Sequence, residues 1–75
     1  MNKARREAIA KLISAIDALH SQADDILNEE QEYFDNMPES FQAGEKGDAA
    51  QEAIENLEAA VQALNEAQEA LENIS

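Results

Sequence analysis

The chain has few residues able to bind a metal ion. His20 is its only histidine, and Asp17 precedes it by three residues. On a helix this spacing places both side chains on one face, as two ligands of one ion require. Two ligands do not make a site, and the sequence has no cysteine and no Glu-x-x-His motif. We predict no metal and no cofactor, and interpret His20 as a semi-buried or solvated helix residue.

Arrangements of residues that carry out catalysis are also missing. The sequence offers no Ser-His-Asp set, no thiol nucleophile and no glycine-rich loop that could hold a phosphate. Its carboxylates are too numerous and too closely spaced for one pair to be isolated as a general acid and base. We predict that the protein is not an enzyme.

Carboxylates dominate the chemistry of the chain. Seventeen acidic residues against five basic ones give a net charge of −12. Residues 1–11 carry +3, whereas residues 12–75 carry −15 with Lys46 as their one basic residue. Such a surface repels nucleic acids and anionic membranes and attracts basic proteins. The composition predicts a protein partner with a basic nucleic-acid-binding surface, and no direct binding of nucleic acid or membrane.

The densest acidic runs permit two interpretations. Asp24-Asp25, Glu29-Glu30-Gln31-Glu32 and Asp35 can form an ordinary solvated helix face. Exposed helices usually interleave lysines with their acids and gain pairs four residues apart, which this chain lacks. A lysine- and arginine-rich partner would supply the missing cations.

Two segments with helical periodicity must position these groups. In the first, Ile9 occupies position a of a heptad pattern whose apolar steps alternate between three and four residues. We expect a helix over about 3–35, capped by Asn2. Its expected a and d positions are Ile9, Leu12, Ile16, Leu19, Ala23, Ile26, Tyr33 and Met37, with Glu30 as a polar interruption, and a second row at e is Ile13, His20, Leu27 and Phe34.

The second segment consists of three similar heptads over residues 52–72 and predicts a helix over about 49–74. Asp48 and Gln51 match a capping box at its start. Alanines flanking the apolar positions let a neighbouring helix approach closely. Its a and d positions are Ile54, Leu57, Val61, Leu64, Gln68 and Leu71, and the flanking alanines are Ala53, Ala60 and Ala67.

The connection over about 36–48 contains the only proline and both glycines, which favour helix ends and turns. A short connection makes the two helices antiparallel neighbours. We therefore predict an all-α fold in which residues 1–75 form one helical hairpin with coiled-coil-like heptads. The basic first turns then lie near Glu66, Glu69 and Glu72.

Seventy-five residues without a disulfide form a marginal core, which favours self-association. Pairing two hairpins as a homodimeric four-helix bundle would cover the flanking rows. A trimer, or a monomer closed by the connection, remains an alternative. No apolar run approaches the ~20 residues of a membrane span, and no signal peptide is evident, so we expect a cytoplasmic protein.

Tyr33, Phe34, Met37 and Phe41 gather at the connection end of the expected hairpin. They predict either a hydrophobic plug or an adaptable pocket, with Ile54 and Leu57 as its other wall. Next to this cluster stands Glu39-Ser40-Phe41, which we expect to be extended.

An extended Glu39-Ser40-Phe41 segment beside an apolar pocket, on a very acidic chain, resembles the Glu-Ser-hydrophobic segment of bacteriophage uracil-DNA glycosylase inhibitors. The run Glu-Glu-Gln-Glu-Tyr-Phe-Asp-Asn-Met-Pro-Glu-Ser over 29–40 is also similar to small heptad-rich proteins of tailed phages and prophages. In the inhibitor family the acidic segment lies in the DNA-binding cleft of the enzyme and imitates DNA. Its best-known members are built on a sheet, so the likeness would be convergent.

The resemblance implies that Glu39 and Ser40 stand in for phosphates and that Phe41 anchors the segment. Glu32 and Asp35 would add charge to the same surface. Phe34, Met37, Ile54 and Leu57 would line the pocket that captures a side chain of the enzyme. A phage origin would place the protein in the cytoplasm of a bacterial host.

Two hypotheses of function follow. The first is a DNA-mimicking inhibitor of a host DNA-binding enzyme, with uracil-DNA glycosylase as its most specific target. The second is a structural or regulatory helical module that binds another copy of itself or a partner helix. A scaffold for an enzyme unrelated to DNA is not separable from the second by sequence.

Overall fold

The computed structural model describes residues 1–74, which form three helices and no strand. These are α1 (Lys3–Asp35), α2 (Glu39–Gln42) and α3 (Glu45–Glu72). The predicted all-α class is confirmed.

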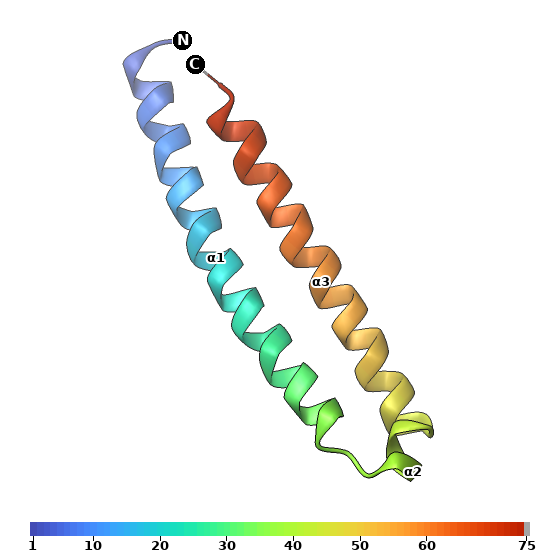
Figure 1. Ribbon diagram of the computed structural model, residues 1–75. Helices are drawn as coiled ribbons and strands as arrows, with labels where there is room; N and C mark the ends of the chain where they lie inside the picture. The colour runs from blue at the N-terminus through green and yellow to red at the C-terminus, as the bar shows by residue number, and fades with distance from the viewer. Residues whose placement is uncertain (75) are drawn as a thin grey trace.

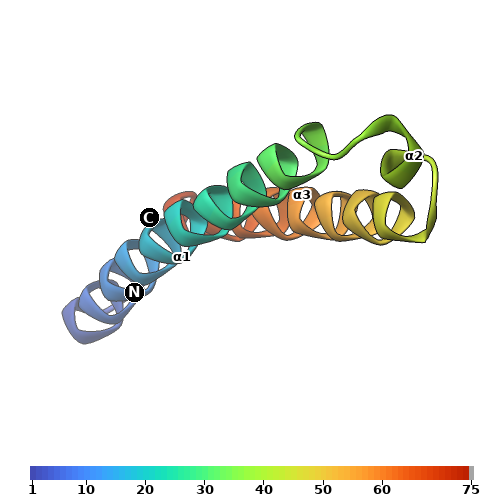
Figure 2. The ribbon, with the colours of Figure 1, turned by 90° about the horizontal axis from the view of Figure 1, so that it is seen from below.

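The two long helices lie side by side and run in opposite directions, so that both chain ends meet at one end of the rod (Figure 1). α2 lies at the other end, against the start of α3. Seen from below, α1 crosses α3 obliquely (Figure 2). The Cα atoms extend over 58 × 14 × 12 Å. Within residues 1–74, no helix combines the length and apolarity needed to cross a membrane.

α1 begins and ends where the sequence predicts. The backbone N–H of Arg5 donates to Oδ1 of Asn2 at 2.8 Å, which confirms Asn2 as the N-cap. The helix continues through Asp24 and Asp25 without a break for 33 residues. It ends before Pro38, whose ring disfavours helix in the preceding residue.

The connection is more helical than expected. The carbonyl of Pro38 accepts hydrogen bonds from the N–H groups of Phe41 and Gln42, at 2.9 and 3.0 Å, and so opens α2. α3 then starts at Glu45, four residues before the predicted start, with Gly44 as its N-cap. The predicted capping box at Asp48 is wrong, because the N–H of Asp48 already donates to the carbonyl of Gly44 at 3.0 Å. Asp48 instead stabilises the helix dipole from the first turn.

A close backbone contact holds the connection in place. Gly47 is buried, and a Cβ atom there would overlap the carbonyl group of Gln42. Gln42 also donates from Nε2 to the carbonyl of Phe34 at 2.9 Å, an acceptor at the end of α1 that also receives the backbone N–H of Met37 at 3.1 Å. α2 is thereby attached to both long helices.

The predicted interface positions of α3 are confirmed. Two adjacent heptad rows contain the most shielded residues of α3. Outside these two rows, Ala53 on the neighbouring row is the one other partly shielded residue of α3. Ala50 and Ile54, 2% and 7% exposed, are the buried apolar side chains of the described chain. The two rows are Gly47, Ile54, Val61 and Gln68, and Ala50, Leu57, Leu64 and Leu71.

The predicted interface of α1 is half wrong. Its a row lies against α3, but the second row at the interface is the e row, Ile13, His20, Leu27 and Phe34. The expected d row is about half exposed, at 52% for Leu12, 50% for Leu19, 52% for Ile26 and 54% for Tyr33. Either row alternates with the a row in steps of three and four, so spacing alone does not choose between them.

Replacing Gly47 by alanine tests the close contact. We expect Gly47→Ala to lower the free energy of unfolding by about 1–3 kcal/mol, the usual cost of forcing an extra methyl group into a packed site. Urea unfolding followed by circular dichroism measures this loss. Gly44→Ala is the matched control, because its Cβ would lie 3.3 Å from the carbonyl oxygen of Ser40 and meet no overlap. Equal stability of the two variants would contradict the contact.

Candidate interaction surfaces

The exposed row of α1 forms one half of an apolar face. At about 100° per residue, this row lies about 80° from the centre of the α1–α3 interface. In α3 the row of flanking alanines lies about 90° from the centre of the same interface, in the same rotational sense. On antiparallel helices two such rows lie on the same side of the pair. The apolar face therefore comprises Leu12, Leu19, Ile26 and Tyr33 of α1 and Ala53, Ala60 and Ala67 of α3.

The outer rows on this side are also poor in charge. On α3 the next row outward is Ala49, Asn56, Ala63 and Ala70, and no carboxylate of α3 lies on that side. On α1 the next row is Ala8, Ala15, Gln22 and Glu29. The apolar face thus has two acidic neighbours on the rows of α1 beside it, Glu29 on the outer row and the half-buried Glu30 on the inner row.

The opposite side of the pair is acidic. The helical positions place nine carboxylates there, and five more lie along the outer edges, away from the interface. We call the set of nine the acidic face: Glu7, Asp17, Asp24, Asp35, Asp48, Glu55, Glu58, Glu69 and Glu72. All of these carboxylates are exposed except that of Asp24, which is half-buried. The helix pair therefore has two chemically different sides.

Two shallow grooves run between the helices on the acidic side. One is lined by His20 and Leu27 of α1 and by polar residues of α3 that include Glu58. The other is lined by Phe34 and Ile54 together with Gln31, Gln51, Glu55 and Glu58. The walls of both combine polar and apolar groups, because Glu58 and its polar neighbours stand beside side chains of the α1–α3 interface.

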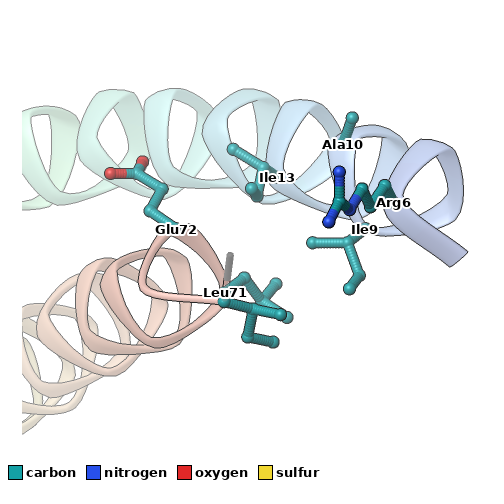
Figure 3. A pocket seen from close by; sticks show the side chains of 7 residues that line it. Arg6, Ile9, Ala10, Ile13, Leu71 and Glu72 are labelled. Carbon is teal, nitrogen blue, oxygen red and sulfur yellow. The ribbon is translucent and has the colours of Figure 1, made fainter. Parts of the chain in front are cut away.

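The helices separate where the chain ends meet. Figure 3 shows Ile9 and Ile13 of α1 opposite Leu71 of α3, with Arg6 and Glu72 at the rim. The hollow between them measures about 550 Å³ and is open to solvent. Its apolar lining belongs to the last layer of the α1–α3 interface.

The predicted partner-binding segment has a different conformation from the one expected. Glu39, Ser40 and Phe41 form a helical turn within α2 rather than an extended strand. Pro38 suits the start of a helix and Glu39 favours its first turn, which explains the difference. Phe41 is 50% exposed and stands near the Nζ atom of Lys46, 5.4 Å from the centre of its ring.

The residues of the predicted apolar pocket are shielded to different degrees. Ile54 is buried, and Phe34, Met37 and Leu57 are half-buried. Phe34 and Ile54 share the wall of a groove, whereas Met37 and Leu57 do not line it. Phe34 and Leu57 lie on the rows where α1 and α3 face each other, and Met37 lies in the connection after α1.

The remaining predicted residues lie apart from one another. Tyr33 projects on the apolar face and Phe41 is exposed on α2, so the expected aromatic cluster is divided. Glu32 and Asp35 are exposed at the end of α1, where Asp35 accepts a hydrogen bond from Nε2 of Gln31 at 3.0 Å. His20 is half-buried and Asp17 exposed, and residues 1–74 contain no group of three acidic, histidine or cysteine side chains that could hold a metal ion.

Comparison of the chain with known protein families, curated proteins and solved structures finds no match. The surfaces of the molecule therefore have to be interpreted from their own chemistry.

The sequence contained a signal for the apolar face that spacing arguments overlooked. The row Leu12, Leu19, Ile26 and Tyr33 is more apolar than the row of Ile13, His20, Leu27 and Phe34, yet the latter is at the interface. A strongly apolar row left over beside an interface, on the same side as a row of alanines, is therefore a candidate for a second contact surface.

Alanine substitutions at two adjacent positions test which row of α1 contacts α3. We expect Leu27→Ala to lower the free energy of unfolding by about 2 kcal/mol, because it removes contacts with α3. Ile26→Ala should change it by less than about 0.5 kcal/mol, because half of that side chain already meets solvent. Thermal unfolding of dilute protein, followed by circular dichroism, compares the two. A larger loss for Ile26→Ala would reverse the assignment.

Proposed function

We propose that this protein is an acidic binding module that occupies the nucleic-acid-binding surface of a basic protein, as a DNA mimic, with uracil-DNA glycosylase as the first target to test. The proposal is supported mainly by the segregation of carboxylates on one long side of a rigid rod. The resemblance of Glu39-Ser40-Phe41 to phage inhibitors supplies the candidate target.

The linear density of the carboxylates fits this proposal. Seventeen carboxylates along 58 Å correspond to one per about 3.4 Å, the spacing of charges along one strand of B-DNA. Four of the five basic residues lie within the first eleven residues, so most of the rod is not neutralised. The rod as a whole therefore carries carboxylates at the linear density of a nucleic-acid strand, and nine of the seventeen lie on the acidic face.

The negative charge is concentrated toward the connection. Residues 24–52 contain ten carboxylates and Lys46, which gives this end −9. At the other end the +3 of residues 1–14 is balanced by Glu66, Glu69 and Glu72. We expect the partner to contact the end that carries α2, where Glu39 and Ser40 are exposed.

The mode of contact differs from the one that the resemblance implies. The short helix α2 offers Glu39 and Ser40 from a rigid turn, and Phe34 and Ile54 are engaged in holding the helices together. The proposed inhibitor therefore acts by covering a basic cleft with fixed carboxylates. It does not depend on capturing a side chain of the enzyme.

A uracil-excision assay tests this function. We expect the protein to inhibit a bacterial uracil-DNA glycosylase at about one-to-one stoichiometry, and Glu39→Lys to weaken inhibition about tenfold, which corresponds to ~1.4 kcal/mol. Glu66→Lys is the matched control, because it makes the same change of charge at an exposed position outside the acidic face, at the end of the rod away from α2. Absence of inhibition at large excess would exclude this enzyme, and equal inhibition by both variants would exclude the α2 end as the contact.

Salt dependence provides a separate test of the electrostatic mechanism. The screening length falls from ~10 Å at 0.1 M salt to ~3 Å at 1 M, so contacts between exposed charges weaken. We expect the concentration for half-inhibition to rise at least about tenfold between 0.1 and 0.5 M sodium chloride. The same titration without inhibitor corrects for the effect of salt on the enzyme. Inhibition that is insensitive to salt would indicate an apolar contact instead.

The apolar face favours a second function, that of a helical module for self-association or for binding a partner helix. An apolar row that repeats over three heptads on one side of a charged rod is typical of helix-on-helix contacts. This function explains Leu12, Leu19, Ile26 and Tyr33, which mimicry leaves unexplained. It is compatible with mimicry, because the two faces lie on opposite sides of the rod, and it includes the four-helix bundle expected from the sequence.

A further inference from the structure

We infer that two copies of this chain pack apolar face against apolar face in opposite orientations, with α1 on α1 and α3 on α3 of the partner copy. This inference deepens the second proposed function, on which it rests. Its occupant is a second copy, and three properties of the described residues support that choice.

The first property is the size and shape of the apolar face. From Leu12 to Tyr33 the face extends ~31 Å at 1.5 Å per residue, and two helices 8–10 Å apart make it roughly 20 Å wide. Two such faces would bury on the order of 1,200 Å², the lower limit for a specific protein–protein interface. The area fits a second rod of the same dimensions and a dimer of modest affinity.

The second property is the complementarity of side chains at each level of the rod. Large residues occupy the α1 half and alanines the α3 half. In the inferred dimer, Leu19 of one copy meets Ile26 of the other, while Ala60 meets Ala67. The alanines let the two α3 helices approach closely and the larger side chains fill the space between the α1 helices.

The third property, the charge distribution, decides the orientation. The end with the connection carries −9, whereas the end with the chain termini is balanced. Copies in the same orientation would place −18 at one end of the dimer, and like charges at close range are unfavourable. Opposite orientation separates the two −9 ends and brings the basic start of α1 in one copy toward Glu29 and Glu32 of the partner copy.

Sedimentation equilibrium between 1 and 500 µM tests the dimer. We expect the mass to rise from 8.2 kDa toward twice that value across this range. Leu19→Glu should remain monomeric. Ala18→Glu adds the same charge at an exposed position of α1 that faces away from α3 and lies outside the apolar face, so this variant should dimerise like the wild type. Circular dichroism of both variants at low concentration establishes that each is helical.

Cross-linking tests the orientation. The chain has no cysteine, so Leu12→Cys and Tyr33→Cys each introduce one thiol. In opposite orientation the two thiols of a Leu12→Cys dimer lie ~31 Å apart, while position 12 of one copy is next to position 33 of the other. A short bis-maleimide should therefore link the mixed variants and leave each variant alone unlinked.

The outcomes separate the inference from the function on which it rests. No dimer at 500 µM would overturn both the inference and self-association. A dimer that Leu19→Glu does not disrupt would overturn the assignment of the apolar face. Cross-linking of Leu12→Cys with itself would overturn the orientation and leave self-association intact.

Discussion

The rotation of α1 relative to α3 is the constraint on which the rest of the structure depends. It decides which apolar row of α1 is shielded by α3 and which remains at the surface. At the connection, Gly47 lets the backbone at Gln42 approach α3, and the Gln42 amide donates to the carbonyl of Phe34 at the end of α1. These two contacts join the long helices at that end of the rod.

The consequence is a molecule with two unlike sides. Rotating α1 so that Leu12 and Leu19 packed on α3 would have left Ile13 and Leu27 beside the carboxylates of the acidic face. The observed rotation instead collects Leu12, Leu19 and Ile26 on the side where α3 presents alanines. Apolar and acidic groups are thereby separated, so that either side can bind a partner without interference from the other.

The two proposed activities are physically compatible. Pairing through the apolar face would leave the acidic faces on the outside of the dimer, with the −9 ends at opposite extremities. Each end would then present Glu39 and its neighbours to a basic surface. Salt distinguishes the two activities. Added salt weakens the electrostatic attraction to a basic protein because it screens charges, whereas it does not screen the apolar contact between copies.

Much of this protein was determined by its sequence alone. Heptad spacing and the absence of helix breakers specify both long helices, Asn2 caps the first, and the interface rows of α3 from Ile54 to Leu71 follow from the pattern. These features depend on residues close together in the chain. The exposed positions of Glu32, Asp35 and Glu39 likewise follow from charge, because isolated carboxylates are rarely buried.

Only the tertiary structure decided which row of α1 meets α3 and what the connection does. Two rows of α1 alternate equally well with the Ile9 row, so spacing within α1 does not choose between them. The place of α2 against α3 likewise depended on Gly47, which lets the backbone at Gln42 come close. Local sequence specifies helices through short-range spacing, whereas the rotation of one helix against another depends on contacts made only once the chain has folded back.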